Sequence, residues 1–270
     1  MGSMPNPILN KNTFKADRAY QTDDTAAGWA APTGMPAAAA AARTRAMTVN
    51  GTIVKTLVLL AVLIAAAGYG WSLVDATAQE PTLSGSAPII LIGSMIGAIA
   101  LGLITAFVPK AAPFTAPLYA LFEGVLVGMI SALYNAQYSG IVLQAVAATL
   151  GVFLVMLFLY TSRTIRVTPR LQQGILMATL GVFVAYLLLF VASLFTNAIE
   201  VFSSGPIGIV FSLIVAGVAA FNLLLDFSFI ETGSQQGAPR RYEWYCGFGL
   251  MVTLVWLYLS ILRVLAAARR

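Results

Sequence analysis

Residues 207–229 read IGIVFSLIVAGVAAFNLLLDFSF, and Asp226 is the only charged residue among them. An α-helix of about 20 residues spans about 30 Å, which is the thickness of the hydrocarbon core of a bilayer. The strands of a membrane β-barrel would instead alternate apolar and polar residues over about ten positions. This stretch therefore predicts a transmembrane helix that contains one carboxyl group.

Similar apolar stretches recur along the rest of the chain. We expect seven transmembrane helices, near residues 53–75, 87–108, 114–134, 140–161, 173–195, 207–229 and 244–264. The chain is 59% hydrophobic and 9% charged, whereas soluble domains have about 25% charged residues. This composition excludes a soluble fold. The connections are short, so neighbouring helices must be antiparallel and the expected fold is all-α, a polytopic membrane bundle.

Residues 1–51 differ from the rest of the chain. They contain no long apolar stretch, but they do contain several prolines and a run of alanines. Such a segment is typical of a flexible tail, and it lacks the apolar core of a secretory signal peptide. We therefore expect a flexible tail over residues 1–51 and a seven-helix transmembrane domain over residues 52–266.

The basic residues indicate how the bundle is oriented. Lys and Arg lie in the tail and in alternate connections, whereas the connections near 76–86, 135–139 and 196–206 have none. By the positive-inside rule, the tail and the basic connections are cytosolic. Arg263, Arg269 and Arg270 do not fit this pattern if the chain crosses seven times. Either the C-terminus lies outside despite these arginines or the last segment is re-entrant, and its length favours a full crossing.

Several kinds of chemistry are excluded. The chain has no histidine and a single cysteine, Cys246, which excludes Ser-His and Cys-His pairs, histidine metal sites and an internal disulfide. A Ser-Lys arrangement would need a lysine within a span, and Lys55 and Lys110 lie at the membrane edges. We expect no enzyme activity and no tightly bound cofactor. The basic residues are topology signals or contacts with the lipid bilayer, so we expect no nucleic-acid partner.

Two acidic residues lie inside the predicted spans. A charged side chain in hydrocarbon costs a few kcal/mol or more, so it needs a partner or a wet cavity. Glu123 lies in the third span and Asp226 near the cytosolic end of the sixth. Asn222 precedes Asp226 by one helical turn, so we expect both side chains to point to the same place. Each acid is either neutral and hydrogen-bonded inside the bundle or a carboxyl group whose ionisation controls an ion path.

Our hypothesis for the gate involves one ion pair. Lys110, between the second and third spans, is the basic residue that we expect at the depth of Asp226, with Arg163 and Arg166 as alternatives. Contact with such a cation would hold the bundle closed, and protonation of Asp226 would weaken it.

Two more acidic residues lie at the cytosolic boundary. Glu231 follows the sixth span and Glu243 begins the seventh, where a negative charge complements the helix dipole. Alternatively, Asp226, Glu231 and Glu243 form a mouth that attracts Ca²⁺ weakly, because calcium binds several oxygen ligands. Arg240 and Arg241 in the same connection would weaken such a metal site.

A set of short segments resembles a known family. The segments are, in chain order, Asn6 to Asn10 with Phe14, Met47 to Thr52, Phe122 to Gly124, Asn222 to Phe227 with Ile230 and Glu231, Glu243 to Tyr245, and Leu257 to Arg263. Over nearly the whole chain, the sequence is similar to the bacterial branch of the Bax inhibitor family. The resemblance implies six helices around a central seventh, in the bacterial cytoplasmic membrane.

The resemblance also implies a pH-sensitive calcium leak. It implies a sensor of two aspartates on helices six and seven, with a basic residue at the end of helix two that contacts the first of them. Asp226 matches the helix-six aspartate and Lys110 lies near the basic position, but Thr253 occupies the position of the helix-seven aspartate. Two acids cannot share a proton there. Glu123, Glu231 or Glu243 could replace the missing acid.

Two functions are consistent with these features of the sequence. The first is a pH-sensitive cation leak channel or exchanger, with Ca²⁺ as the transported ion and protonation of Asp226 as the gate. The alternative is a regulator without transport, which binds a membrane protease or another membrane protein through its tail.

Overall fold

The computed structural model describes residues 46–75, 82–83, 85–194 and 205–269. Most of the predicted tail, residues 1–45, lies outside this part of the chain. Seven helices are long and apolar enough to cross a membrane. They are α3 (Val49–Ser72), α4 (Ala87–Phe107), α5 (Ala112–Gln137), α6 (Ile141–Thr161), α7 (Pro169–Ser193), α9 (Gly205–Gln235) and α10 (Tyr242–Ala268). The predicted all-α bundle of seven transmembrane helices is confirmed.

Short elements connect some of the helices. A 3-10 turn, η1 (Pro109–Ala111), joins α4 to α5, and two short antiparallel strands, β1 (Val74–Asp75) and β2 (Thr82–Leu83), lie between α3 and α4. The apolar stretch of α9 ends at Phe229, but the helix continues through polar residues to Gln235. This extension places Glu231 on the helix.

Local sequence explains where the helices begin. Thr48 precedes α3 with an extended backbone, and its hydroxyl group accepts a hydrogen bond from Gly51 N at 2.9 Å. Thr168 caps α7 in the same way, and Pro169 follows it at the first helical position. Both arrangements satisfy or remove backbone donors that the first turn of a helix leaves without partners.

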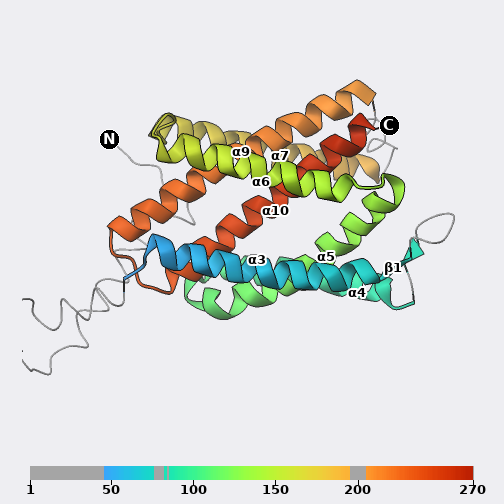
Figure 1. Cartoon of the computed structure of the whole chain (residues 1–270), viewed down its shortest axis with the longest axis horizontal. Helices are drawn as coiled ribbons and strands as arrows, with labels where there is room; N and C mark the ends of the chain where they lie inside the picture. Colours follow the sequence, from blue (N-terminus) through green and yellow to red (C-terminus); the bar gives the residue numbers. More distant parts are fainter. Residues whose placement is uncertain (1–45, 76–81, 84, 195–204, 270) are drawn as a thin grey trace, which may run out of the picture.

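The bundle has two layers with one helix between them (Figure 1). One layer contains α3, α4 and α5, the other contains α6, α7 and α9, and α10 crosses diagonally between them. Helix α10 packs mainly on α9, α3, α6 and α5. Its side chains include many of the most buried in the protein, such as Met251, Leu257 and Leu262. The expected arrangement of six helices around a central seventh is confirmed.

Small residues allow α3 and α5 to approach closely. A Cβ atom on Gly124 would collide with the Leu63 carbonyl oxygen, and one on Gly128 would collide with the Ala67 carbonyl oxygen. Small residues allow such backbone contact between helices in membranes. The Gly124 and Gly128 pair therefore fixes the closest helix contact in one layer.

The C-terminal arginines have partners at the far end of the bundle. Arg269 donates to the Ser139 carbonyl oxygen at 3.1 Å and to Gln144 Oε1 at 2.8 Å, at the connection between α5 and α6. Arg263 donates to the Tyr186 hydroxyl group on α7. Helix α10 thus runs from the α9–α10 connection to the opposite end of the bundle, as a full crossing requires.

Candidate functional site

Asp226 lies on the face of α9 that packs against α10. Its Oδ2 atom is buried and has no hydrogen-bond partner within the described residues. The Thr253 hydroxyl group on α10 is close enough to interact with the carboxyl group. Gly249, one turn earlier on α10, leaves space beside Asp226 Oδ1. The position at which the family resemblance implies a second aspartate therefore faces Asp226.

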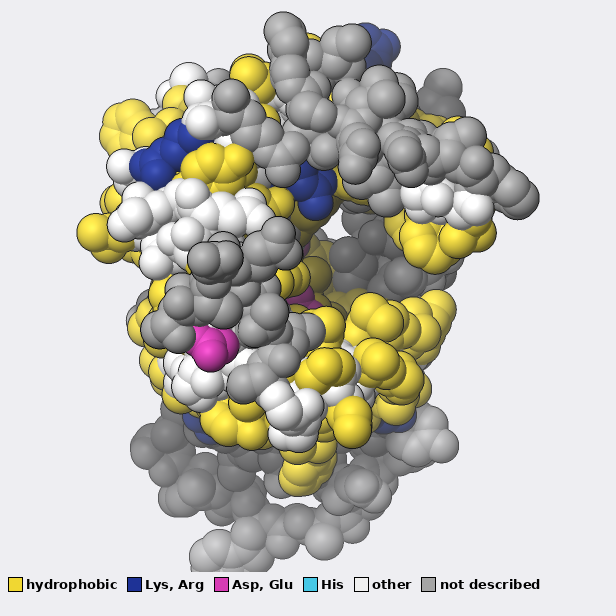
Figure 2. Space-filling view, turned by 90° about the vertical axis from the view of Figure 1, so that its right-hand side faces the viewer, with side chains coloured by type: hydrophobic (Ala, Val, Ile, Leu, Met, Phe, Trp, Pro, Cys, Tyr) yellow, Lys and Arg dark blue, Asp and Glu magenta, His cyan; other side chains and the backbone are white. Residues whose placement is uncertain are grey.

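The Asp226 carboxyl group lines a cavity of about 250 Å³. Ala106 of α4, Gln172 of α7 and Cys246 of α10 form parts of its wall. Polar side chains from the last turns of α9, among them Ser228 and Thr232, also line it. A cavity of this size with several polar groups in its wall has room for several water molecules. Figure 2 shows the opposite end of the bundle, where α10 finishes, and there too the molecule is hollowed between its two layers.

Glu123 is connected to this cavity through two aromatic rings. Its carboxyl group lies beside the Tyr119 side chain, one turn earlier on α5, close enough to interact with it. The Tyr119 ring packs edge-on against Phe248 of α10, with centroids 5.0 Å apart, and Phe248 lines the Asp226 cavity. Glu123 therefore lies beside a tyrosine whose ring packs against α10.

Asn222 does not point into the cavity with Asp226. Its Nδ2 atom donates to Thr179 Oγ1 of α7 and to the Val218 carbonyl oxygen, both at 2.8 Å. The two residues lie one turn apart on α9, as expected, but Asn222 joins α9 to α7 while Asp226 faces α10. The expectation that both side chains point to the same place is therefore wrong.

Lys110 lies in the turn η1 between α4 and α5. The structure shows no ion pair between Lys110 and Asp226 within the part of the chain that it describes. Arg163, one of the alternatives, pairs with Glu231 instead. The proposed ion pair that holds the bundle closed remains a prediction.

Glu231 faces α6. It accepts a hydrogen bond from the Tyr160 hydroxyl group and another from Gln235 Nε2 at 3.1 Å. Arg163 lies 3.6 Å from its Oε1 atom. These contacts join the ends of α6 and α9 at the side of the bundle where both helices finish.

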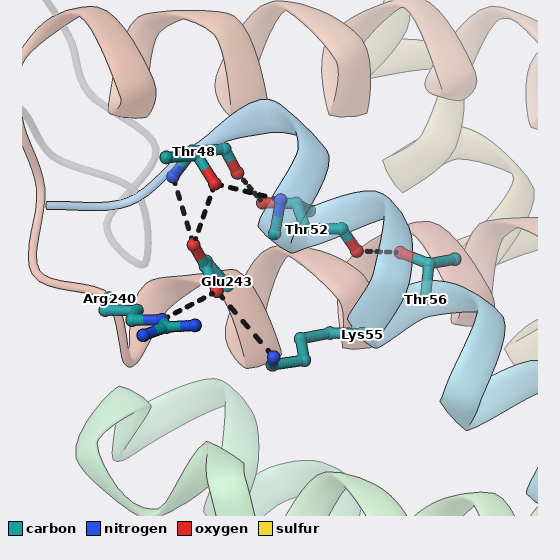
Figure 3. Close-up of polar contacts among 7 residues, drawn as sticks. Thr48, Thr52, Lys55, Thr56, Arg240 and Glu243 are labelled. Carbon is teal, nitrogen blue, oxygen red and sulfur yellow. Dashed lines mark hydrogen bonds and ion pairs between the residues drawn. The ribbon is translucent and has the colours of Figure 1, made fainter. Parts of the chain in front are cut away.

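Glu243 is the most completely enclosed acidic residue of the described chain, at 1% exposure. Its Oε1 atom accepts hydrogen bonds from Thr48 N at 3.1 Å and from Thr48 Oγ1 at 3.2 Å (Figure 3). Its Oε2 atom lies 3.6 Å from Arg240 Nε and 4.0 Å from Lys55 Nζ. Glu243 is in the first turn of α10, as expected for a negative charge that complements the helix dipole. Its carboxylate also binds the beginning of α3.

The contact between Glu243 and α3 was not expected from the sequence. Thr48 and Glu243 lie far apart in the chain, and the hydroxyl group of Thr48 also has an ordinary role as a helix cap. Gly51 could have indicated this contact in the sequence, because the Glu243 carboxylate occupies the space that a Cβ atom would take at that position. A glycine in the first turn of an apolar helix marks a close approach of another group.

The predicted weak cation site formed by Asp226, Glu231 and Glu243 is not present. Within the described residues, no three acidic or cysteine side chains lie close enough together to hold a metal ion. Glu231 faces α6 and Tyr160, Glu243 faces α3 and Thr48, and Asp226 lies in its own cavity. The three acids point away from one another because they lie on different faces of α9 and α10.

The seven long apolar helices of the described chain define the class of this molecule as a polytopic membrane protein with a seven-helix bundle. The chain matches the family model described as Bax inhibitor 1 like over residues 6–270, and it belongs to that family. A comparison with curated protein sequences found no match.

Proposed function

We propose that the bundle is a pH-sensitive leak channel or exchanger for cations, Ca²⁺ above all, and that protonation of Asp226 gates it. The main support is the position of Asp226, which lines a mainly apolar cavity that also contains several polar side chains. One of its carboxyl oxygens is buried and has no hydrogen-bond partner among the described residues. Charged groups inside a membrane protein usually mark an ion or proton path. The membrane is expected to be the bacterial cytoplasmic membrane, with the N-terminus in the cytosol.

The Asp226 cavity offers ligands that suit a hard cation in transit. A carboxylate, hydroxyl groups and an amide oxygen are the oxygen donors that Ca²⁺ prefers, and Asp226, Thr232 and Gln172 provide them. With a single carboxylate, the cavity would hold such an ion only briefly, as a leak requires. The proposal includes no resident cofactor and no enzymatic reaction.

Protonation would change what this cavity can bind. An ionised carboxyl group only accepts hydrogen bonds, whereas a protonated one also donates. The Thr253 hydroxyl group lies 3.1 Å from the Gly249 carbonyl oxygen, to which it donates. The Thr253 hydroxyl oxygen can therefore accept a hydrogen bond from a protonated Asp226. An ionised Asp226 cannot donate, so either the Thr253 hydroxyl hydrogen turns from Gly249 toward it or a cation binds to it. One proton would thus reverse which of the two groups can donate a hydrogen bond across the contact between α9 and α10.

The test is Ca²⁺ flux into dye-loaded liposomes with the full chain, from mildly acidic to mildly alkaline pH. Flux should depend on pH in the wild type and lose that dependence in Asp226→Asn, which cannot ionise. Glu231→Gln is the matched control, because Glu231 lies on the same helix outside the cavity. An Asp226→Asn protein with the wild-type pH profile would contradict the gate. Absence of flux at every pH from folded protein would contradict the channel.

One observation favours the alternative, a regulator without transport. The residues just before α3 are fixed to the α9–α10 connection. Met47 N donates to the Ala238 carbonyl oxygen at 2.6 Å, Ala46 pairs with Pro239, and Thr48 binds Glu243. Residues 46–48, to which the tail is joined, are thus held on the bundle by these contacts, as a tail that acts as a binding segment would require. If deletion of residues 1–45 abolishes the cellular function and Asp226→Asn does not, the regulator is favoured.

A further inference from the structure

A second and larger hollow lies on the outside of the bundle, between α3 and α6. Its volume is about 940 Å³. Val49, Ile53 and Leu57 of α3 form one wall, and α6 forms the other. Leu250 and Leu254 of α10 lie on its floor. The groove exists because α3 and α6 pack mainly on α5, α9 and α10 rather than on each other. Asp226 does not line this groove.

The groove has the length of one membrane leaflet. Along α3 it extends from Val49 to Leu60, and along α6 from Leu150 to Thr161. Each stretch corresponds to about 16 Å at about 1.5 Å per residue, and half of the hydrocarbon core is about 15 Å. The groove therefore begins at the membrane surface and ends near the middle of the bilayer. Its mouth is at the end of the bundle where α6 and α9 finish, which is the predicted cytosolic end.

The mouth of the groove is positively charged and its interior is apolar. Arg163 and Arg166, in the connection between α6 and α7, line the mouth together with Glu231. Arg163 pairs with Glu231 at 3.6 Å, yet its side chain remains 72% exposed, so its other donors are accessible. Two arginines against one glutamate leave a net positive charge. Arginine matches the oxygens of a phosphate group in geometry as well as in charge.

We propose that this groove binds an anionic phospholipid of the same leaflet, with an acyl chain between α3 and α6 and the phosphate at Arg163 and Arg166. The apolar walls match the chain in length, and the arginines complement the headgroup. A lipid in this position would connect two helices that pack little on each other. It should therefore stabilise the bundle as well as bind to it. This inference is independent of the proposed ion passage.

The first test compares two lipids with the same acyl chains. The full chain is purified in detergent and titrated with phosphatidylglycerol or phosphatidylcholine, and bound lipid is counted by native mass spectrometry while the unfolding temperature is recorded. Phosphatidylglycerol should remain bound and raise the unfolding temperature more than phosphatidylcholine does. Glycerol phosphate alone should do neither, because it cannot fill the groove. Equal effects of the two lipids, or an equal effect of glycerol phosphate, would overturn the proposal.

Variants at the mouth test the headgroup contact. The double variant R163Q/R166Q should lose affinity for phosphatidylglycerol by about tenfold or more, since each basic residue near an anionic lipid contributes about fivefold. R163K/R166K should recover most of the preference for phosphatidylglycerol over phosphatidylcholine. This recovery would show that the glutamine variant lost affinity because it lost positive charge and not because it failed to fold. Arg170→Gln is the matched control, because Arg170 is an exposed arginine of the same region that does not line the groove. Equal loss in Arg170→Gln would overturn the site.

A variant inside the groove tests the acyl-chain contact. Leu57→Trp should fill the space and release lipid, whereas Val58→Trp should not, because Val58 is exposed on the same helix outside the groove. If the wild-type protein instead forms a dimer without bound lipid, and Leu57→Trp breaks that dimer, a second copy occupies the groove and the lipid proposal is wrong.

Discussion

The Asp226 carboxyl group on α9 faces the Thr253 hydroxyl group on α10, across the contact between the central helix and its main partner. Thr253 is 8% exposed and donates to the Gly249 carbonyl oxygen. Relatives in this family are expected to have an aspartate where this chain has Thr253, so the facing pair here contains one acid instead of two. A hydroxyl group cannot share a proton in the way that a second carboxylate can.

We predict that Thr253→Asp changes the form of the pH dependence of flux. Two carboxyl groups that face each other titrate as a coupled pair with two apparent pKa values. The flux profile should therefore change from one step to two, as measured in dye-loaded liposomes at closely spaced pH values. Thr253→Asn, which adds a polar group of similar size without a charge, should keep a single step. A two-step profile in Thr253→Asn would show that a change of shape, not a second acid, is responsible.

We predict that Glu243→Ala is strongly destabilising. It would leave the Thr48 N–H group and the Lys55 ammonium group without their partner and would open space beneath α3. Leaving a largely buried hydrogen-bonding group without its charged partner costs about 1–3 kcal/mol of unfolding free energy. Denaturation in mixed micelles should give this difference. Glu231→Ala is the control, because the Glu231 side chain is 37% exposed and exposed ion pairs contribute about 1 kcal/mol or less.

The number and type of helices could be predicted from hydropathy because each apolar stretch is long and uninterrupted. The boundaries were harder to predict wherever polar residues continue a helix. Helix α9 runs past Phe229 to Gln235 even though Gly233 lies in its last turns, and it ends just before Gly237, whose backbone has a positive φ of 66°. Helix α5 begins at Ala112, before the predicted 114, because Pro113 is favourable in a first turn.

The candidate site could be predicted only in part. Asp226 stands out in sequence because a charge inside an apolar stretch is costly. The directions of its neighbours could not be read from helical spacing alone. Asn222 lies one turn away but hydrogen-bonds to Thr179 of another helix, and Glu243 binds Thr48 at the other end of the chain. These partners depend on tertiary packing, which a helical repeat does not encode.

We predict that Gly128→Ala weakens the contact between α3 and α5. The added methyl group would collide with the Ala67 carbonyl oxygen, which belongs to the backbone of α3 and cannot rotate away. Overpacking of this kind costs about 1–3 kcal/mol of unfolding free energy. Gly151→Ala on α6 is the matched control, because nothing lies within 4 Å of the added atom. The control should be neutral or more stable by up to about 1 kcal/mol, since alanine favours a helix more than glycine does.

We predict that the two ends of α10 lie on opposite sides of the membrane. Arg269 binds the Ser139 carbonyl oxygen at the α5–α6 connection, so single cysteines at Ser139→Cys and Ala268→Cys should react with a membrane-impermeant maleimide from the same side. Gln235→Cys, at the end of α9, should react only from the other side. Cys246 is 4% exposed, so the wild-type chain should give little background labelling. The positive-inside rule places Gln235 in the cytosol. Labelling of Ala268→Cys from the same side as Gln235→Cys, with Ser139→Cys still labelled from the other side, would mean that the last segment is re-entrant and that the arginine contacts at the end of α10 do not form in the membrane.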